Sequence, residues 1–318
     1  MTTTPPSTSP SPSPSPSPLD ILASRLLGWA GSEPEPMRWP KLRAAWIAIS
    51  LHVCVRLTLA VWFSGQHRWL LPLPGLCFIA GQFRRAMRPA AIVLAVTQCI
   101  RFGLTWPDVS NHYLVECLAV VIFAVVDLAR DEERDLCLRM LSWLAIVVLL
   151  MSGLQKCLHG AYFHGQYLAY MVANTDRYRD FFAPILSQAD LVHLKSLEGA
   201  MQGLKFSGDQ LLGALPGPYR VHSTLFVLVS NLVWISEITL ALGLLWRRVR
   251  PVALVLVMVV MAGILASSRE LFFDTLVINL LLLVARTDLN RKLLPLSLAA
   301  YGYYLLGGLD VVHVSFVW

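Results

Sequence analysis

The 318 residues are 56% hydrophobic and only 14% charged, and their mean hydropathy is +0.59. Together with many long apolar runs, this composition is typical of a polytopic membrane protein and argues against a soluble domain. The formal charge of +6 comes from short bursts of arginine between the apolar runs. Such bursts indicate membrane orientation rather than one basic face, so we expect no nucleic-acid partner.

Residues 1–40 differ from the rest because they contain the Ser-Pro repeat TTTPPSTSPSPSPSPSPL. This repeat lacks the apolar surface needed to fold, so we expect a disordered cytoplasmic tail. It has no basic start followed by an apolar core and a small-residue cleavage site, so we expect the first spanning helix to direct insertion. Residues 19–29 are a candidate for a short interfacial helix.

Nine apolar runs predict an all-α integral membrane protein, a polytopic bundle of about nine transmembrane helices. They lie at residues 44–64, 70–83, 89–104, 111–128, 138–157, 222–246, 250–267, 271–286 and 293–309. The second run has about fourteen residues and contains Pro72 and Pro74. It either crosses the bilayer or is re-entrant, and in the second case eight helices span.

The arginines and lysines favour nine spans, because short cytoplasmic loops carry the excess of positive charge. Every second loop is basic, through Arg38, Lys41, Arg43, Arg84, Arg85, Arg88, Arg130, Arg134, Arg139, Arg247, Arg248, Arg250, Arg286, Arg291 and Lys292. The alternate short loops contain only Arg68 and Arg269. This pattern predicts a cytoplasmic N-terminus and an external C-terminal tail, residues 311–318.

The long connection 158–220 then lies outside the cytoplasm. Its segments AYFHGQYLAYMVA, YRDFFAPILSQ and LVHLKSLEGAMQGL alternate apolar and polar residues at helical spacing. We therefore expect short amphipathic helices lying on the outer membrane surface.

The cysteines show no spacing that predicts chemistry. All six lie singly within or at the ends of apolar segments, without a CxxC pair: Cys54, Cys77, Cys99, Cys117, Cys137 and Cys157. We interpret them as small hydrophobic residues of buried helices and expect neither thiol redox chemistry nor a bound metal.

Ionisable residues inside the spans are costly and are the first places to look for function. His112 and Glu116 are one helical turn apart and form a candidate acid–base pair. Lys156 ends the fifth span, with Gln155 beside it and His159 three residues later. Its ammonium either snorkels to the lipid headgroups or is desolvated enough to act as a base.

Two further groups of charges have structural interpretations. Arg56 and Glu237 both fall at middle depth, so we expect them to form a structural ion pair. Arg269, Glu270 and Asp274 fall at the outer start of the eighth span. Acidic residues favour the positive end of the helix dipole, so we interpret both carboxylates as a solvated helix start. The alternative is a site for a polar headgroup or a substrate.

Two motifs carry a resemblance to a known family. SNHYLVECLAVVIFAVVD and SGLQKCLHGAYFHGQYL resemble, in order and separation, motifs of the HTTM (horizontally transferred transmembrane) family, which includes the membrane domain of the vitamin K-dependent gamma-carboxylase. WISEITLALGLLWRRVRPVALVL is similar to a third segment of that family. The resemblance covers residues 41–310 and implies an HTTM-like transmembrane domain in a cell membrane, which for the bacterial relatives is the inner membrane.

The resemblance also implies site residues. It assigns Lys156 as the base that deprotonates reduced vitamin K or menaquinol, and His112 as its support. Oxygen then attacks the hydroquinone anion, and the resulting strong base removes a glutamate gamma proton before carbon dioxide adds. The resemblance assigns no other residue a role. From their place in or at the ends of the spans, or beside Lys156 and His112, we add these supporting positions: Asn111, Glu116, His159, Gln155, Glu237, Arg269 and Glu270.

The chain departs from the family pattern in two places. The β-rich part with which the carboxylase holds its protein substrate has no counterpart in these residues, so we expect no propeptide recognition. An apolar stretch around Met261 replaces a histidine that the family often shows after the Arg-Pro turn.

These observations leave two functions open. The first is a quinol-dependent carboxylase or epoxidase type of enzyme that takes a peptide or protein substrate at the outer face. The second is a non-catalytic quinone- or lipid-binding component of a respiratory or maturation system. A transporter ranks last, because the sequence shows neither an inverted repeat nor a matched pair of broken spans.

Overall fold

The computed structural model describes residues 35–64, 72–105, 111–158, 160–197, 224–268, 270–285 and 289–308, and every regular element in these ranges is a helix. The predicted all-α class is confirmed. Each predicted apolar run contains one helix: α2 (Glu35–Ser64), α3 (Pro72–Ala80), α4 (Met87–Thr105), α5 (Asn111–Val125), α6 (Asp131–Leu158), α11 (Thr224–Leu245), α12 (Arg250–Ser268), α13 (Leu271–Val284) and α15 (Leu294–Gly308).

Five of the described helices are long and apolar enough to cross a membrane. They are α2, α4, α6, α11 and α12, so the chain is a helical membrane protein. The helices α5, α13 and α15 have 14 or 15 residues and rise about 22 Å, against a hydrocarbon core of about 30 Å. The nine residues of α3 rise only about 14 Å. Helix length therefore establishes spanning segments but leaves both the nine-span and the eight-span predictions open.

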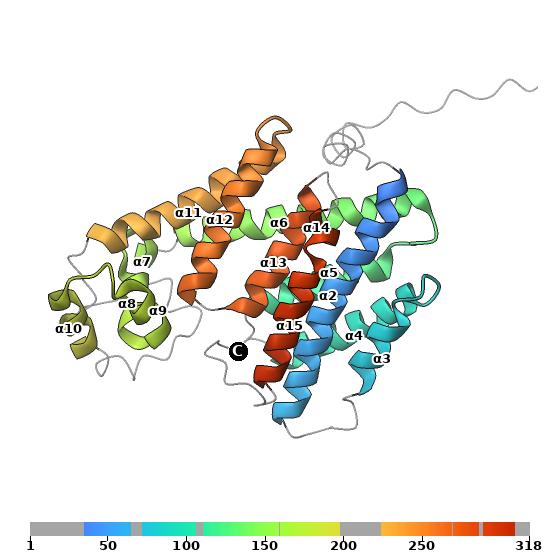
Figure 1. Cartoon of the computed structure of the whole chain (residues 1–318), viewed down its shortest axis with the longest axis horizontal. Coiled ribbons are helices and arrows are strands. Elements are labelled where there is room, and N and C mark those ends of the chain that lie inside the picture. The colour runs from blue at the N-terminus through green and yellow to red at the C-terminus, as the bar shows by residue number, and fades with distance from the viewer. Residues whose placement is uncertain are drawn as a thin grey trace, which may run out of the picture. The chain divides into compact units, whose positions relative to one another are not determined.

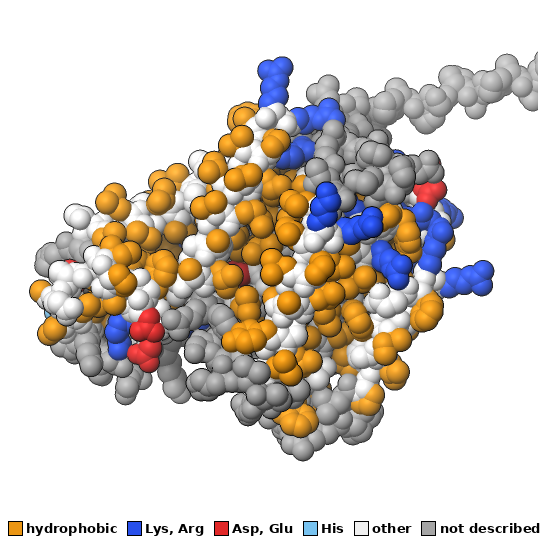
Figure 2. All heavy atoms as spheres, viewed as in Figure 1, with side chains coloured by type: hydrophobic (Ala, Val, Ile, Leu, Met, Phe, Trp, Pro, Cys, Tyr) orange, Lys and Arg blue, Asp and Glu red, His pale blue; other side chains and the backbone are white. Residues whose placement is uncertain are grey.

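The exposed surface of the long helices is strongly apolar. Figure 2 shows hydrophobic side chains over the faces of α11 and α12. Large exposed examples are Leu228, Leu232, Leu242, Val252, Val255 and Val259. Such a surface would be costly in water and is the expected contact face for lipid chains.

Helix α2 lies at the centre of one group of helices, where it packs against α13 and α15 (Figure 1). Val55 and Leu59 of α2 meet Phe272 of α13 and the tyrosines Tyr301 and Tyr304 of α15 in one buried cluster. The ring of Phe272 lies 4.6 Å from that of Tyr304, and Tyr301 packs edge-on at 5.7 Å. Aromatic pairs at these distances stabilise a helix interface beyond their buried area.

The second group contains α6, α11 and α12. Helix α6 packs against both α11 and α13 and thereby connects the two groups. In Figure 1, α6 and α11 run across the view at a steep angle to α2 and α15. The helices of this protein therefore do not share one direction.

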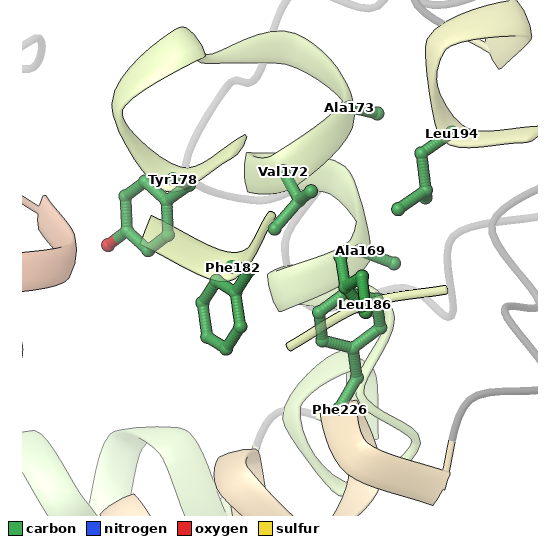
Figure 3. Close-up of a cluster of buried hydrophobic side chains, with 8 residues drawn as sticks. All are labelled: Ala169, Val172, Ala173, Tyr178, Phe182, Leu186, Leu194 and Phe226. Carbon is green, nitrogen blue, oxygen red and sulfur yellow. The ribbon is translucent and has the colours of Figure 1, made fainter. Parts of the chain in front are cut away.

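Short helices fill the described part of the long connection, as predicted: α7 (Gly160–Phe163), α8 (Gln166–Asn174), α9 (Asp176–Phe182) and α10 (Gln188–Leu197). Their apolar residues pack on one another and on Phe226 at the start of α11 (Figure 3). The buried members of this small core are Ala169, Val172, Ala173, Tyr178, Phe182, Leu186, Leu194 and Phe226. The apolar residues of these helices thus share a core of their own, which an arrangement of separate helices on a membrane surface would not provide.

Gly165 joins α7 to α8 in the left-handed region, with φ 68°. A Cβ atom there would lie 2.7 Å from the backbone carbon of Phe226. Only glycine combines this conformation with so close an approach. The residue therefore fixes the small helices against the start of α11.

Several sequence-based predictions lie outside the described residues. These are residues 1–34 of the tail, with its interfacial helix at 19–29, the end of the long connection (198–220) and the external tail (311–318). Residues 35–40, which were assigned to the disordered tail, instead form the first turns of α2, so that boundary is wrong.

Candidate functional site

Lys156 lies in the last turn of α6. Three acidic residues, Asp131, Glu132 and Glu133, begin the same helix. Acidic residues at the first turn and a cation at the last both favour the helix dipole. The charge pattern of α6 is thus the one that stabilises a long isolated helix, and it does not by itself assign a function to the lysine.

The ammonium of Lys156 binds a buried carboxylate. Its Nζ donates to Glu237 Oε1 of α11 at 2.5 Å and to Ser152 Oγ, one turn earlier on α6, at 2.9 Å. Ser152 Oγ also donates to Glu237 Oε1 at 3.3 Å. The lysine side chain is 19% exposed and that of Glu237 only 3%. The ammonium is therefore held by a buried carboxylate rather than extended toward lipid headgroups.

Gly153 allows α6 and α11 to approach closely enough for this pair. A Cβ atom on Gly153 would lie 2.8 Å from Ile238 Cγ1 and 3.0 Å from both Glu237 Cβ and the Trp234 carbonyl oxygen. Small residues permit such backbone approach at helix interfaces in membranes. Gly153 therefore serves both the packing of α6 on α11 and the formation of the Lys156–Glu237 pair.

The predicted pair of Arg56 and Glu237 is wrong. Arg56 bonds to Glu116 of α5, and Glu237 bonds to Lys156. The prediction compared depths counted along each helix, which is valid only for helices that share one direction. Because α11 crosses the bundle at a steep angle to α2, Glu237 reaches the end of α6 instead (Figure 1).

Glu116 is fully buried and belongs to a second polar cluster. One carboxylate oxygen bonds to Arg56 and lies 3.3 Å from His52 Nε2, and the other accepts from Gln98 Nε2 at 3.4 Å. The guanidinium of Arg56 stacks over the Tyr113 ring, 4.0 Å from its centre. Three side chains from α2 and α4 thus surround one carboxylate.

This cluster changes the role expected for Glu116. The partners found for its carboxylate are residues of α2 and α4, whereas the prediction paired it with His112 on its own helix. The side chains of His112 and Asn111 lie outside the described residues, as do His159 and Arg269. The predicted support of Lys156 by His112 therefore stays a prediction.

The start of α13 carries two carboxyl groups near Lys156. Glu270 is half-buried, and burial raises its pKa, while the charges of Arg177 and Lys156 act in the opposite direction. Asp274, one turn further, is only 2% exposed, and its Oδ2 has no hydrogen-bond partner in the described chain. The interpretation of Asp274 as part of a solvated helix start is thus wrong, because neighbouring helices cover it.

Helices α7 to α9 place tyrosines beside the pair. The rings of Tyr162 and Tyr167 stack at 4.5 Å, and Asn231 of α11 holds α7 through a 3.0 Å bond to the Phe163 carbonyl. Burial raises the pKa of both tyrosines, so their hydroxyls stay neutral. Tyr162 lies near enough to Glu237 for an electrostatic interaction.

Arg177 of α9 anchors these small helices on the bundle. Its Nη1 donates to the carbonyl of Ser268, the last residue of α12, at 2.7 Å. This bond brings a positive charge to the same helix end as Glu270. The contact had no signal in the sequence, because the two residues are 91 positions apart.

The structure therefore brings together only part of the predicted site. Lys156 and Glu237 touch, Glu270 lies near them, Gln155 is exposed on α6 and Glu116 belongs to the other cluster. The site also contains Asp274, which was interpreted as a solvated helix start, and three residues that the sequence analysis did not select: Ser152, Tyr162 and Arg177. Of these, only Ser152 had a usable signal, since it is four residues before Lys156 and shares its helix face.

The chemistry of this arrangement is proton exchange. Lys156 and Glu237 can share one proton over 2.5 Å, as an ammonium and a carboxylate or as an amine and an acid. Within the ranges that the structure covers, no group of three metal-ligating side chains forms.

No family model, curated protein or solved structure matches this chain.

Proposed function

We propose that this protein is a membrane enzyme that takes a proton from a lipid-soluble acid, such as a quinol, at the Lys156–Glu237 pair. The observation that carries the proposal is the pair itself, because a cation and a carboxylate are desolvated together at the end of an apolar helix. Perturbed, buried ionisable pairs are concentrated at functional sites. The HTTM-like motif that ends at Lys156 supports the same residue as the base.

Reduced vitamin K or menaquinol, with oxygen and carbon dioxide as co-substrates, is the chemistry that the resemblance implies. The residues fit a hydroxylated ring, since Glu237 Oε2 is buried and has no hydrogen-bond partner within the described part of the chain. That oxygen would accept an O–H from the ring. A bound quinol would supply the acidic hydroxyl and the reducing electrons.

The pair must change its protonation before Lys156 can act as a base. The ammonium first transfers one proton from Nζ to Glu237 Oε1, which leaves a neutral amine and a neutral acid. The amine then accepts the proton of the substrate hydroxyl and becomes an ammonium again, while the substrate becomes an anion beside it. The low dielectric of the site favours the neutral form of the pair before the substrate binds.

For membrane topology, we propose nine spans, with the N-terminus in the cytoplasm and the C-terminus outside, in the inner membrane of a bacterium. The alternation of basic loops supports this arrangement, and the helices found in all nine runs are compatible with it. The Lys156 site then lies at the outer side. Labelling of single cysteines in the turns after α3 and α12 from each side of the membrane would test the orientation.

Activity is tested with purified full-length protein in lipid. Reduced vitamin K or menaquinol is supplied with oxygen, and the products are epoxide and carbon dioxide fixed into glutamyl peptides. We expect turnover by the wild type and a loss of about 10²-fold or more in Lys156→Ala. Equal turnover by the two proteins would show that the assignment of Lys156 is wrong.

The alternative, a non-catalytic quinone- or lipid-binding component, has one observation in its favour. Glu237 compensates the charge of Lys156 in the described structure. An ion pair without net charge can bind a quinone without taking part in a reaction. In that case a quinone co-purifies with the protein, its occupancy is unchanged in Lys156→Met, and no product forms.

A further inference from the structure

Asp274 is a buried carboxyl group near Lys156 to which the proposed reaction assigns no role. It lies in the second turn of α13 and is 2% exposed. No ion pair or hydrogen bond to its side chain is present in the described structure, and its Oδ2 is fully enclosed without a partner. This contrasts with Glu237, whose Oε1 receives two hydrogen bonds.

The surroundings of Asp274 oppose a negative charge. Glu270, one turn earlier, repels it, and Lys156 of α6 is the only attractive charge that acts on it among the described residues. That ammonium is already bound to Glu237. A carboxylate buried without a bonded partner takes up a proton instead, because desolvation disfavours the charged form.

Other groups near α13 do not supply the missing partner. Tyr178 of α9 lies close enough to interact with Asp274, but its buried hydroxyl is neutral. The basic side chains of α2, Arg56 and His52, meet the ring of Phe272 rather than Asp274. Arg177 acts on Glu270.

Asp274 and Glu270 are neighbours at the start of α13, and both interact electrostatically with Lys156. The Asp274 backbone N–H donates to the Glu270 carbonyl at 3.0 Å, so the two side chains follow one another on α13. Glu270 is half-buried, whereas Asp274 is enclosed. Asp274, at 2% exposure, is thus more enclosed than Lys156, whose side chain is 19% exposed, and Glu270 lies one turn nearer the start of the helix.

We propose that Asp274 is a protonated acid in the folded protein and that it passes protons between the Lys156–Glu237 pair and Glu270. In each transfer the Asp274 O–H gives its proton to Glu270 and regains one from the Lys156 ammonium, so no co-reactant is needed. The evidence that Asp274 is protonated is its burial without a bonded partner, which does not depend on the proposed function. The direction of the transfer rests on the proposed function, in which the pair collects a substrate proton that must leave.

Infrared spectroscopy of the purified full-length protein tests the protonation. The wild type should show the carbonyl stretch of a protonated carboxyl group at neutral pH, sensitive to exchange into D₂O. The band should be lost in Asp274→Asn and kept in the control Asp127→Asn, which alters an exposed aspartate. Absence of the band from the wild type, or its persistence in Asp274→Asn, would overturn the inference.

Thermal unfolding shows whether the Asp274→Asn variant is correctly folded. Asparagine has the shape of a protonated aspartate, so Asp274→Asn should melt at the same temperature as the wild type or higher. A loss as large as that of Asp274→Leu would mean that the native group is ionised, and the inference would fail.

Turnover separates this inference from the proposed function. If the wild type uses a quinol, Asp274→Asn should lower kcat about 10²-fold at unchanged KM and shift the pH profile of kcat. An unchanged profile would remove the transfer role. If the wild type has no turnover but shows the Asp274 band, the proposed function fails and the protonation stands.

Discussion

Within the described part of the chain, two ion pairs with buried carboxylates join different helices, and they differ in how completely these carboxylates are bonded. Glu116 is bonded by Arg56 and Gln98 and also lies next to His52, and the arginine is further held over Tyr113. Glu237 has Lys156 and Ser152 on one oxygen and nothing described on the other. A fully bonded charge is held in one geometry and serves the fold, whereas an incompletely bonded one can still accept a proton or a ligand.

The comparison predicts that Glu116→Ala causes the largest loss of stability. Arg56 would be left without its carboxylate inside the bundle, and loss of one partner of a buried pair costs about 3–5 kcal/mol. Thermal or denaturant unfolding in detergent measures this loss. Asp127→Ala, in the exposed turn after α5, is the control and should change stability by less than about 0.5 kcal/mol. Similar losses in the two variants would contradict a structural role for the Glu116 cluster.

Gly153→Ala should weaken the other pair through the backbone. The new methyl group would meet the Trp234 carbonyl and the Ile238 side chain at 2.8–3.0 Å, so α6 and α11 must separate. Overpacking of this kind costs about 1–3 kcal/mol. Gly263→Ala on α12 is the matched control, because nothing lies within 4 Å of its Cβ position. The control should be neutral or stabilising by up to about 1 kcal/mol, and equal losses would show that the helices do not touch at Gly153.

A double-mutant cycle compares the pairs directly. Lys156→Met and Glu237→Gln should be coupled by about 0.5–3 kcal/mol, since the two groups are in contact. The coupling should be smaller than that of Arg56 with Glu116, because only one carboxylate oxygen of Glu237 is bonded, whereas both oxygens of Glu116 are. If the stability losses of the two single variants simply add up in the double variant, the Lys156–Glu237 pair does not form in solution.

The smallest expected effect is a pH dependence from Glu270. Burial raises the pKa of Glu270 above its ordinary value of 4.5 in the folded protein. The folded state therefore binds the proton more tightly than the unfolded state does, so the contribution to stability is present at low pH. It is lost as the pH rises through the raised pKa. In Glu270→Gln the melting temperature should depend less on pH over that range. An unchanged slope of melting temperature against pH would contradict the assignment.

Much of the fold could be predicted from local sequence. Apolar length identified a helix in every run, and periodicity identified short helices in the long connection. These properties depend on neighbours within one helix. The candidate site could be predicted only in part, because Lys156 and Glu237 were selected as costly charges but were assigned to different partners.

The errors have a common cause. The Arg56–Glu237 prediction and the solvated interpretation of Asp274 both assigned depth or exposure from position along one helix. Exposure depends on which other helix covers a residue, and crossing angles are set by side-chain packing between helices. Ser152 is the exception, since a spacing of four residues on α6 places it beside Lys156 without any tertiary information.

The sequence alone determined that this is a helical membrane protein, because apolar runs of spanning length have no stable alternative to helix in a bilayer. It also determined that Lys156 ends its helix. Only the tertiary structure decided that Glu237 neutralises this lysine, that Glu116 belongs to a separate cluster and that Asp274 is enclosed. The physical reason is that a charge acquires its partner and its dielectric surroundings from residues far away in the chain, once the helices have packed.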